Sequence, residues 1–311
     1  MTAPLVVLTG ATGFIGSTVL HRLAGTAGRV RLRVLTRRRI ALPVPAEQVH
    51  ADLGDPGSLA GACEGAQVLL HLASYIGADA DRCRQVNETG TAHLMREAVR
   101  AGVPRVVHLS TTAVYGPGPH RDVEVGDVRP RPASAVSRSR LAAEAHALRA
   151  GALVLRAGLV LGPGDRWVVP ALAELCARAP GYWNGGRGHG SYIDVADLAR
   201  LTAAAAVDTD RPVRGVHHAA HPAPVRVREL LDALAAQDVL PRPRDELTRD
   251  EAHALLRRNP GRVTERQFGL LTDDHWYRAT RLWARCGCAP GPGPLARLPR
   301  ARTWYRDLLA A

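Results

Sequence analysis

The chain has 311 residues, 46% of them hydrophobic, and is long enough to bury a large core in one domain or two closely joined ones. Its net charge is +12, but all 41 basic residues are arginines scattered along every segment, which argues against a nucleic-acid-binding patch. The complete lack of lysine excludes an internal Schiff base and a lysine general base.

No apolar run approaches the roughly 20 residues that are needed to span a bilayer, so we expect no membrane partner. The N-terminal stretch has no basic segment before its few apolar residues, which favours a cytoplasmic protein over a secreted one. The five cysteines form no CxxC pair and the thirteen histidines no HExxH pattern, so we expect no metal site.

Residues 5–16, LVVLTGATGFIG, join a short apolar run typical of a buried parallel strand to three glycines and the start of a helix. The glycines let the backbone turn tightly and approach a pyrophosphate at the positive end of that helix. The GxxGxxG spacing differs from the commoner GxGxxG, but its place after a strand predicts a dinucleotide-binding loop rather than a plain glycine-rich turn. The candidate cofactor contacts here are Gly10, Thr12, Gly13, Phe14, Ile15 and Gly16.

A second strand is expected at 31–35, and Thr36-Arg37-Arg38-Arg39 follows it. In dinucleotide-binding folds this position meets the adenosine ribose, where a carboxylate accepts from the 2′-hydroxyl and an arginine binds a 2′-phosphate. Since arginines and no carboxylate stand here, the sequence predicts NADPH/NADP as the cofactor, with Arg37 and Arg38 as contacts. A solvated run of charges is the alternative.

Strands and helices alternate along the first half of the chain. Further strands are expected at 49–53, 66–72, 105–109 and 153–161, and helices at 17–24, 87–102 and 135–149. This alternation predicts an α/β fold with a doubly wound parallel sheet, whose ligand lies at the carboxyl ends of the strands.

The pattern becomes mixed beyond Gly162. Helices are expected at 168–177, 198–207 and 227–236, a strand at 216–218, and a loop with five glycines at 181–190. We expect an NADP-binding domain at 1–162, which also takes in about 191–220. A smaller substrate-binding subdomain, made mostly of 163–311, is expected to interleave with it.

Seven segments together resemble the extended short-chain dehydrogenase/reductase family: TGATGFIG (9–16), ADLGD (51–55), HLAS (71–74), NETGT (87–91), LSTTAVYG (109–116), LRAGLVLGPGD (155–165) and YIDVADLA (192–199). The resemblance covers nearly the whole chain and implies a Rossmann-type domain with a smaller substrate-binding part. It also implies that Asp52 and Leu53 contact adenine and that Ala73 and Ser74 line the cofactor ribose.

In that family an Asn, a Ser or Thr, and a Tyr with a Lys four residues later move the proton. Asn87 matches the first residue and Thr111 the second, with Ser110 as a further catalytic candidate. In the helix SAVSRSRLAAE, Val136 stands where the tyrosine belongs and Arg140 where the lysine belongs. The resemblance therefore implies an atypical branch without the usual acid, in which Arg140 holds ribose hydroxyls in place of lysine.

Losing a general acid costs roughly 10² to 10⁴ in rate, whereas orienting the two reactants contributes more. Alcohol oxidation needs a base, but ketone reduction needs only that the developing alkoxide be stabilised and later protonated. The replacements resemble the atypical ketoreductases of aromatic polyketide biosynthesis. They imply an NADPH-dependent ketoreductase of antibiotic biosynthesis that acts on a polycyclic aromatic, angucyclinone-like ketone, whose own phenol hydroxyl stabilises the oxyanion.

Two alternatives remain open: a non-catalytic NADP-binding sensor, and a sugar-nucleotide epimerase or dehydratase, although the chemistry of the latter begins with alcohol oxidation. Tyr75 and Tyr115 are candidate substitute acids, with core packing as the alternative role. Flat aromatic rings could stack on the substrate, although an aromatic side chain can equally belong to the core. The candidate substrate contacts are Tyr75, Val136, Trp167, Trp183 and Tyr192.

Overall fold

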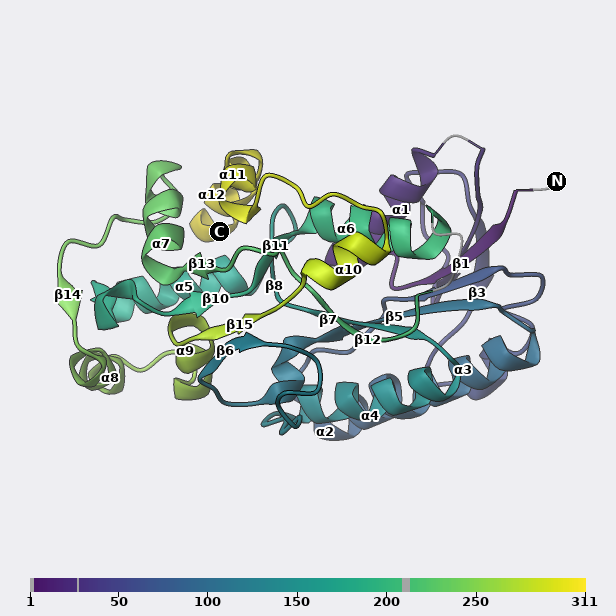
Figure 1. Ribbon diagram of the computed structural model, residues 1–311, viewed down its shortest axis with the longest axis horizontal. Helices are drawn as coiled ribbons and strands as arrows, with labels where there is room; N and C mark the ends of the chain where they lie inside the picture. The colour runs from purple at the N-terminus through teal and green to yellow at the C-terminus, as the bar shows by residue number, and fades with distance from the viewer. Residues whose placement is uncertain (1–2, 27, 209–212) are drawn as a thin grey trace.

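The computed structural model describes residues 3–26, 28–208 and 213–311. Its larger part is a seven-stranded sheet in which every strand pair is parallel and the order is β12-β7-β5-β4-β1-β2-β3 (Figure 1). The strands are β1 (Leu5–Thr9), β2 (Arg31–Thr36), β3 (Glu47–His50), β4 (Val68–His71), β5 (Arg105–Thr111), β7 (Leu153–Ala157) and β12 (Gly215–Ala219). The predicted doubly wound parallel sheet is confirmed.

Helices cover both faces of this sheet, which is why its central strands are continuous apolar runs (Figure 1). On one face, α1 (Phe14–Ala24) and α6 (Val195–Ala203) share a core with Leu8 of β1. On the other face, α3 (Gly90–Arg100) and α4 (Ala135–Arg149) pack against Leu69 of β4.

The helix expected from residue 87 begins earlier in the structure. The short α2 (Ala80–Cys83) and a π-helical turn (Arg84–Thr89) precede α3. The helix begins at α2 because the Asp79 carboxylate accepts hydrogen bonds from the backbone N–H groups of Asp81 and Arg82, both at 3.0 Å.

The strand expected at 153–161 divides in two. At Gly158 the chain leaves the sheet, and β8 (Leu159–Leu161) pairs with β11 (Tyr192–Asp194) instead. A Cβ at Gly158 would lie 2.3 Å from the backbone oxygen of Ser191, so only glycine fits this close approach.

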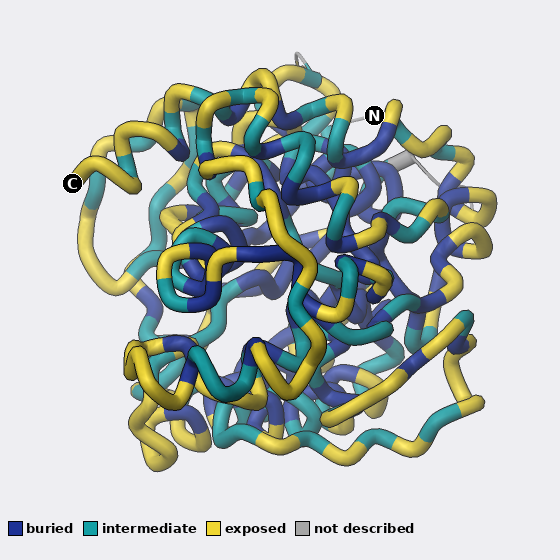
Figure 2. Tube along the Cα trace, turned by 90° about the vertical axis from the view of Figure 1, so that its left-hand side faces the viewer, coloured by how far each residue is buried: buried dark blue, intermediate teal, exposed yellow. Residues whose placement is uncertain are grey.

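The smaller part lies at the other end of the molecule. Its buried residues lie in the interior, and its exposed residues lie on the outer sides of its helices and in its loops (Figure 2). A second core joins its helices, which are α5 (Val168–Arg178), α7 (Val227–Ala236), α8 (Arg249–Arg258), α9 (Glu265–Thr272), α11 (Pro294–Arg297) and α12 (Arg302–Ala310). Its short strands are β6 (His120–Val123), β9 (Tyr182–Trp183), β10 (His189–Gly190), β13 (Val225–Arg226), β14 (Glu246–Leu247) and β15 (His275–Tyr277). Strand β6 falls within a stretch rich in proline and glycine, 117–132, for which the sequence pattern predicts no strand.

The two parts are interleaved along the chain. After β6 the chain returns to the large sheet with α4 and β7, and after α5, β9 and β10 it returns with α6 and β12. A third return is made by α10 (Thr280–Arg285), whose Leu282 and Trp283 belong to the same core as α1 and α6.

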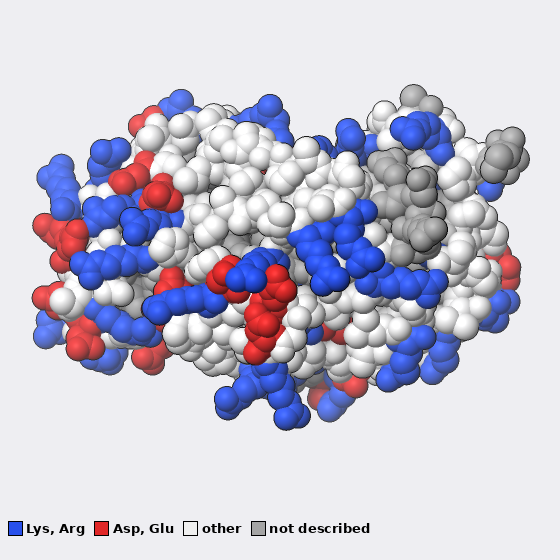
Figure 3. All heavy atoms as spheres, viewed as in Figure 1, with Lys and Arg blue, Asp and Glu red and all other residues white. Residues whose placement is uncertain are grey.

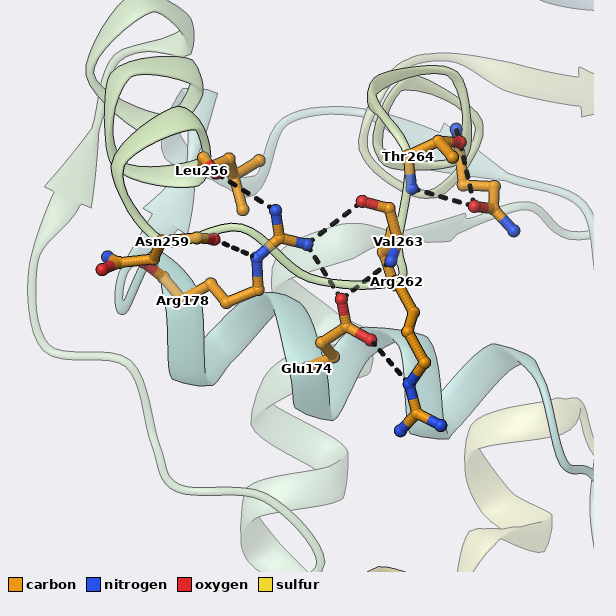
Figure 4. Close-up of polar contacts among 8 residues, drawn as sticks. Glu174, Arg178, Leu256, Asn259, Arg262, Val263 and Thr264 are labelled. Atoms are coloured by element: carbon orange, nitrogen blue, oxygen red, sulfur yellow. Dashed lines mark hydrogen bonds and ion pairs between the residues drawn. The ribbon is translucent and has the colours of Figure 1, made fainter.

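One arginine fixes the connection between α8 and α9 (Figure 4). The Arg178 guanidinium at the end of α5 donates to the backbone oxygens of Leu256 at 3.1 Å, Asn259 at 2.6 Å and Val263 at 3.1 Å. Glu174, one turn earlier, accepts from Arg178 at 2.9 Å and from the Val263 N–H at 2.8 Å. A connection without regular structure therefore gains a defined path.

Within the described part of the chain, no helix is both long and apolar enough to cross a membrane. Basic side chains lie over both parts of the molecule on the face seen in Figure 3, and acidic side chains are interspersed among those of the smaller part.

Candidate functional site

A cleft of about 760 Å³ opens at the carboxyl ends of β1, β2 and β4. Ligands of doubly wound sheets bind at this edge because the loops that follow neighbouring strands converge there. The predicted cofactor contacts that line the cleft are Gly10, Thr12, Gly13, Arg37, Arg38, Asp52, Leu53, Ala73 and Ser74.

The glycine loop brings three backbone segments close together. Gly10 has φ +78°, and a Cβ there would lie 2.7 Å from the backbone nitrogen of Ala73. A Cβ at Gly16 would lie 2.0 Å from the Gly10 oxygen, so α1 can start directly behind the loop only with glycine at this position. These glycines leave the cleft open where side chains would otherwise fill it.

The N-terminus of α1 points its unpaired N–H groups toward this loop. The helix has no side-chain cap and no acidic residue in its first turn, so these groups and the helix dipole remain available for an anion. The residues present therefore fit a dinucleotide pyrophosphate. Phe14, Ile15 and Gly16 lie behind the lining residues: the Phe14 ring abuts Gly164, and Ile15 packs on the sheet core.

The loop after β4 is held by Asn87. Its Oδ1 accepts from the Tyr75 N–H at 2.7 Å and from the Ser74 hydroxyl at 3.2 Å. Its Nδ2 donates to the Tyr75 oxygen at 2.9 Å and to the Ser139 hydroxyl on α4 at 3.0 Å. With all of these bonds made in the interior, Asn87 positions the wall of the cleft and is not free to move a proton.

The two hydroxyls at the end of β5 have different surroundings. Ser110 is fully buried and donates to Glu144, which is itself paired with Arg156 at 2.7 Å. Its predicted catalytic role is not supported, because its hydroxyl belongs to a buried ion-pair network. Thr111 is partly exposed and its Oγ1 accepts from the Ala113 N–H at 3.2 Å, which leaves the hydroxyl hydrogen free to donate.

Val136 is partly buried in the first turn of α4, and Arg140 lies one turn later. The Arg140 guanidinium donates to the Leu109 backbone oxygen at 2.8 Å, and burial lowers its pKa to about 10. It lies close to the buried rings of His71 and His108. Burial is the main reason why the pKa values of both rings are lowered, and the positive charge of Arg140 lowers them further. Arg140 does not line the cleft, so its predicted contact with ribose hydroxyls stays a prediction.

Tyr115 is buried, and its hydroxyl is 2.7 Å from Nε2 of His218. Nδ1 of His218 is 3.0 Å from the Arg278 oxygen, so Nδ1 carries the hydrogen and Nε2 accepts from Tyr115. Burial raises the pKa of Tyr115 and lowers that of His218 to about 4. Tyr115 is therefore occupied and inaccessible, whereas Tyr75 lines the cleft.

Two of the four aromatic residues predicted to contact a substrate are in the core. Trp183 is 1% exposed and donates to the Ala179 oxygen at 2.8 Å. Tyr192 is also 1% exposed, and burial raises its pKa above the usual range. Their burial contradicts a role in substrate contact, because neither ring presents a surface to a ligand. Trp167, which precedes α5, is exposed and keeps this role as a prediction.

The sequence analysis missed Arg82, which lines the cleft from α2. Its guanidinium lies 4.9 Å from the centre of the Tyr75 ring. No motif marks this residue, and its segment was not expected to be helical. In the described residues, no group of histidine, cysteine and acidic side chains is arranged to hold a metal ion.

The chain belongs to the NAD dependent epimerase/dehydratase family, whose sequence model matches residues 6–217. This assignment agrees with the resemblance to extended short-chain dehydrogenases/reductases. Family membership supports an enzyme that depends on NAD(P), and it does not by itself choose between reduction and epimerisation.

Several relatives are named as reductases. The 2-alkyl-3-oxoalkanoate reductase of Stenotrophomonas maltophilia is 28% identical over 313 residues, covering 92% of this chain and 89% of that protein. The ceramide reductase of Caulobacter vibrioides is 34% identical over 184 residues. This match covers 57% of this chain and 52% of that protein. Another relative, the sterol demethylase protein B of Methylococcus capsulatus, is 36% identical over 118 residues. This match covers 36% of this chain and 36% of that protein.

Among solved structures, the UDP-N-acetylglucosamine 4-epimerase of Methanobrevibacter ruminantium M1 superposes with a TM-score of 0.75. The match covers 99% of both chains at 18% identity. At this identity the similarity establishes the shared fold.

Proposed function

We propose that this protein is an NADPH-dependent ketoreductase that reduces a carbonyl of a polycyclic aromatic, angucyclinone-like polyketide in antibiotic biosynthesis. The proposal depends mainly on the two replaced positions in α4, Val136 and Arg140, which leave the chain without the family's tyrosine and lysine. The replacements resemble those in the angucyclinone ketoreductase of the simocyclinone pathway.

The arrangement at the end of β5 favours reduction over oxidation. Val136 has no polar atom and the Tyr115 hydroxyl is donated to His218, so neither can act as the base, and Tyr75, which lines the cleft, is the remaining candidate. Thr111 can donate its free hydroxyl hydrogen to a developing alkoxide, and solvent or a phenol beside the ketone can complete the protonation. Such a site suits a substrate that polarises its own carbonyl.

The cofactor half of the proposal depends on charge. Arg37 and Arg38 line the cleft after β2 and no carboxylate follows that strand, so a 2′-phosphate would meet two guanidiniums. A bound NADPH would supply the hydride. The chain's own part is to orient the dinucleotide along the strand ends and to place the ketone beside Thr111.

The test is NADPH consumption by the purified protein on addition of hydroxylated polycyclic ketones. Turnover that needs the phenol beside the carbonyl, and that falls when this hydroxyl is methylated, supports the proposal. Tight NADPH binding without turnover of any such ketone would favour the sensor hypothesis. Conversion of a nucleotide sugar instead would place the chain with the epimerases of its family.

A further inference from the structure

Arg82 is an unpaired cation at the edge of the cleft. It is exposed, and in the described part of the chain no carboxylate lies within ion-pair distance of it. Its near neighbour Arg84 is paired with Asp81. The Arg82 guanidinium lies over the face of the Tyr75 ring, 4.9 Å from its centre. A cation without a counter-ion beside a ligand cleft has its charge available for an anionic ligand.

The sheet order locates Arg82 relative to the other cations. Strands β2 and β4 flank β1 on opposite sides, so Arg37 and Tyr75 lie on opposite sides of the glycine loop. A dinucleotide whose pyrophosphate sits at the start of α1 would direct its 2′-phosphate toward Arg37. Arg82 lines the same cleft on the β4 side, over the Tyr75 ring.

The backbone around Arg82 is fixed, but its side chain is not. Asn87 bonds both the N–H and the oxygen of Tyr75, and Asp79 caps the turn that carries Arg82. The guanidinium contacts the Tyr75 ring, and a contact of this kind at an exposed site is weaker than a bidentate bond to phosphate. A phosphate oxygen can therefore draw the side chain over the cleft.

We propose that Arg82 binds the dinucleotide pyrophosphate, with the Tyr75 ring positioning its side chain at the edge of the cleft. This inference depends on the dinucleotide part of the proposed function and not on the identity of the ketone. It assigns to α2 a binding role that no sequence motif marks.

The test measures dissociation constants of NADPH, NADH and ADP-ribose by calorimetry, without turnover. We expect Arg82→Ala to weaken all three by a similar factor of about ten, because all contain the pyrophosphate. Arg82→Lys should recover part of the loss, and higher salt should shrink the difference from the wild type. Arg84→Ala, which removes an exposed guanidinium two residues away, is the matched control and should leave all three dissociation constants unchanged.

Arg37→Ala serves as the comparison at the other end of the cleft and should weaken NADPH alone. If Arg82→Ala weakens NADPH alone, or leaves all three constants unchanged, the pyrophosphate role is refuted. A wild-type protein that binds none of the three would refute both this inference and the cofactor part of the proposed function. Normal binding without ketone reduction would refute only the reductase proposal.

Discussion

His108 on β5 is buried with neither ring nitrogen hydrogen-bonded, next to the His71 ring at 5.0 Å between centres. Burial holds its pKa well below the usual value, so the ring is neutral and carries two unmet polar atoms. We predict that His108→Leu is neutral or stabilises the fold by about 1 kcal/mol in urea unfolding. His71→Leu is the contrast: it loses bonds to Thr9 and Thr91 and should destabilise. A large loss in His108→Leu would contradict this account.

The hydroxyl of Tyr115 should be dispensable for turnover. Tyr115→Phe keeps the stacking on Tyr277 at 5.1 Å and removes the interactions of the hydroxyl with His218 and Arg156. We expect the rate of ketone reduction to stay within about threefold and the free energy of unfolding to fall by about 1 kcal/mol. Thr111→Val should reduce the rate at least about tenfold, as expected for loss of an oxyanion donor. A hundredfold loss in Tyr115→Phe with unchanged cofactor affinity would show that Tyr115 is the missing acid.

The types of residue in the sequence predicted the cofactor-binding cleft better than they predicted the residues that would contact the substrate. The glycine loop and the arginines after β2 could be placed because their positions follow from the strand before them. Ser110 and Thr111 could not be distinguished by type, although adjacent residues of a strand face opposite sides and only one reaches the buried Glu144. The burial of Trp183 could not be predicted, because its ring packs against Phe268, which is far away in the sequence.

Arg178 links its own helix, α5, to the end of α8 and to the connection that leads to α9. Arg178→Ala would leave the oxygens of Leu256, Asn259 and Val263 without their donor, and we predict a loss of about 2–4 kcal/mol in urea unfolding. Arg178→Lys should recover less than half, because an ammonium cannot reach three acceptors in different directions.

Hydrogen exchange provides the local readout for this prediction. The amides of α9 should exchange faster in Arg178→Ala, while those of α1 keep their wild-type rates. Arg257→Ala, an exposed change on α8, is the control and should lie within about 0.5 kcal/mol of the wild type. Equal effects from the two substitutions would show that the contacts of Arg178 do not hold the connection.

Element positions were predictable where the pattern is local. The helix at 135–149 coincides with α4, and its Ser134 cap explains the start. The division into β7 and β8 was not predictable, because it depends on a pairing with β11 that local hydrophobicity does not contain. Strand β6 was hidden among prolines and glycines for the same reason, since its partner is β15.

For the whole molecule, buried neutral histidines predict loss of stability in mild acid. Burial lowers the pKa of His71 to about 3 and that of His218 to about 4, against about 6.5 in the unfolded chain. Above pH 6.5 both histidines are neutral in the folded and in the unfolded protein, so the contribution of the buried rings to stability is fully present. As the pH falls below this value the unfolded chain takes up protons that the folded protein does not, so the free energy of unfolding decreases until the folded pKa values are reached.

The expected slope is up to about 1.4 kcal/mol per pH unit for each such histidine. Urea unfolding at pH 7.5, 6.5, 5.5 and 4.5 measures it, and His71→Asn should reduce the slope between pH 6.5 and 4.5. A flat profile over this interval would mean that the histidines are protonated in the folded protein.

The overall architecture followed from the alternation of strands and helices, but the return of α10 to the first core did not. That return has a consequence for synthesis on the ribosome. Leu282 and Trp283 belong to the same buried core as residues of α1 and α6. Until residue 283 has emerged from the ribosome, the nascent chain exposes the apolar surface that these two side chains cover, so the dinucleotide-binding part cannot complete its core before then.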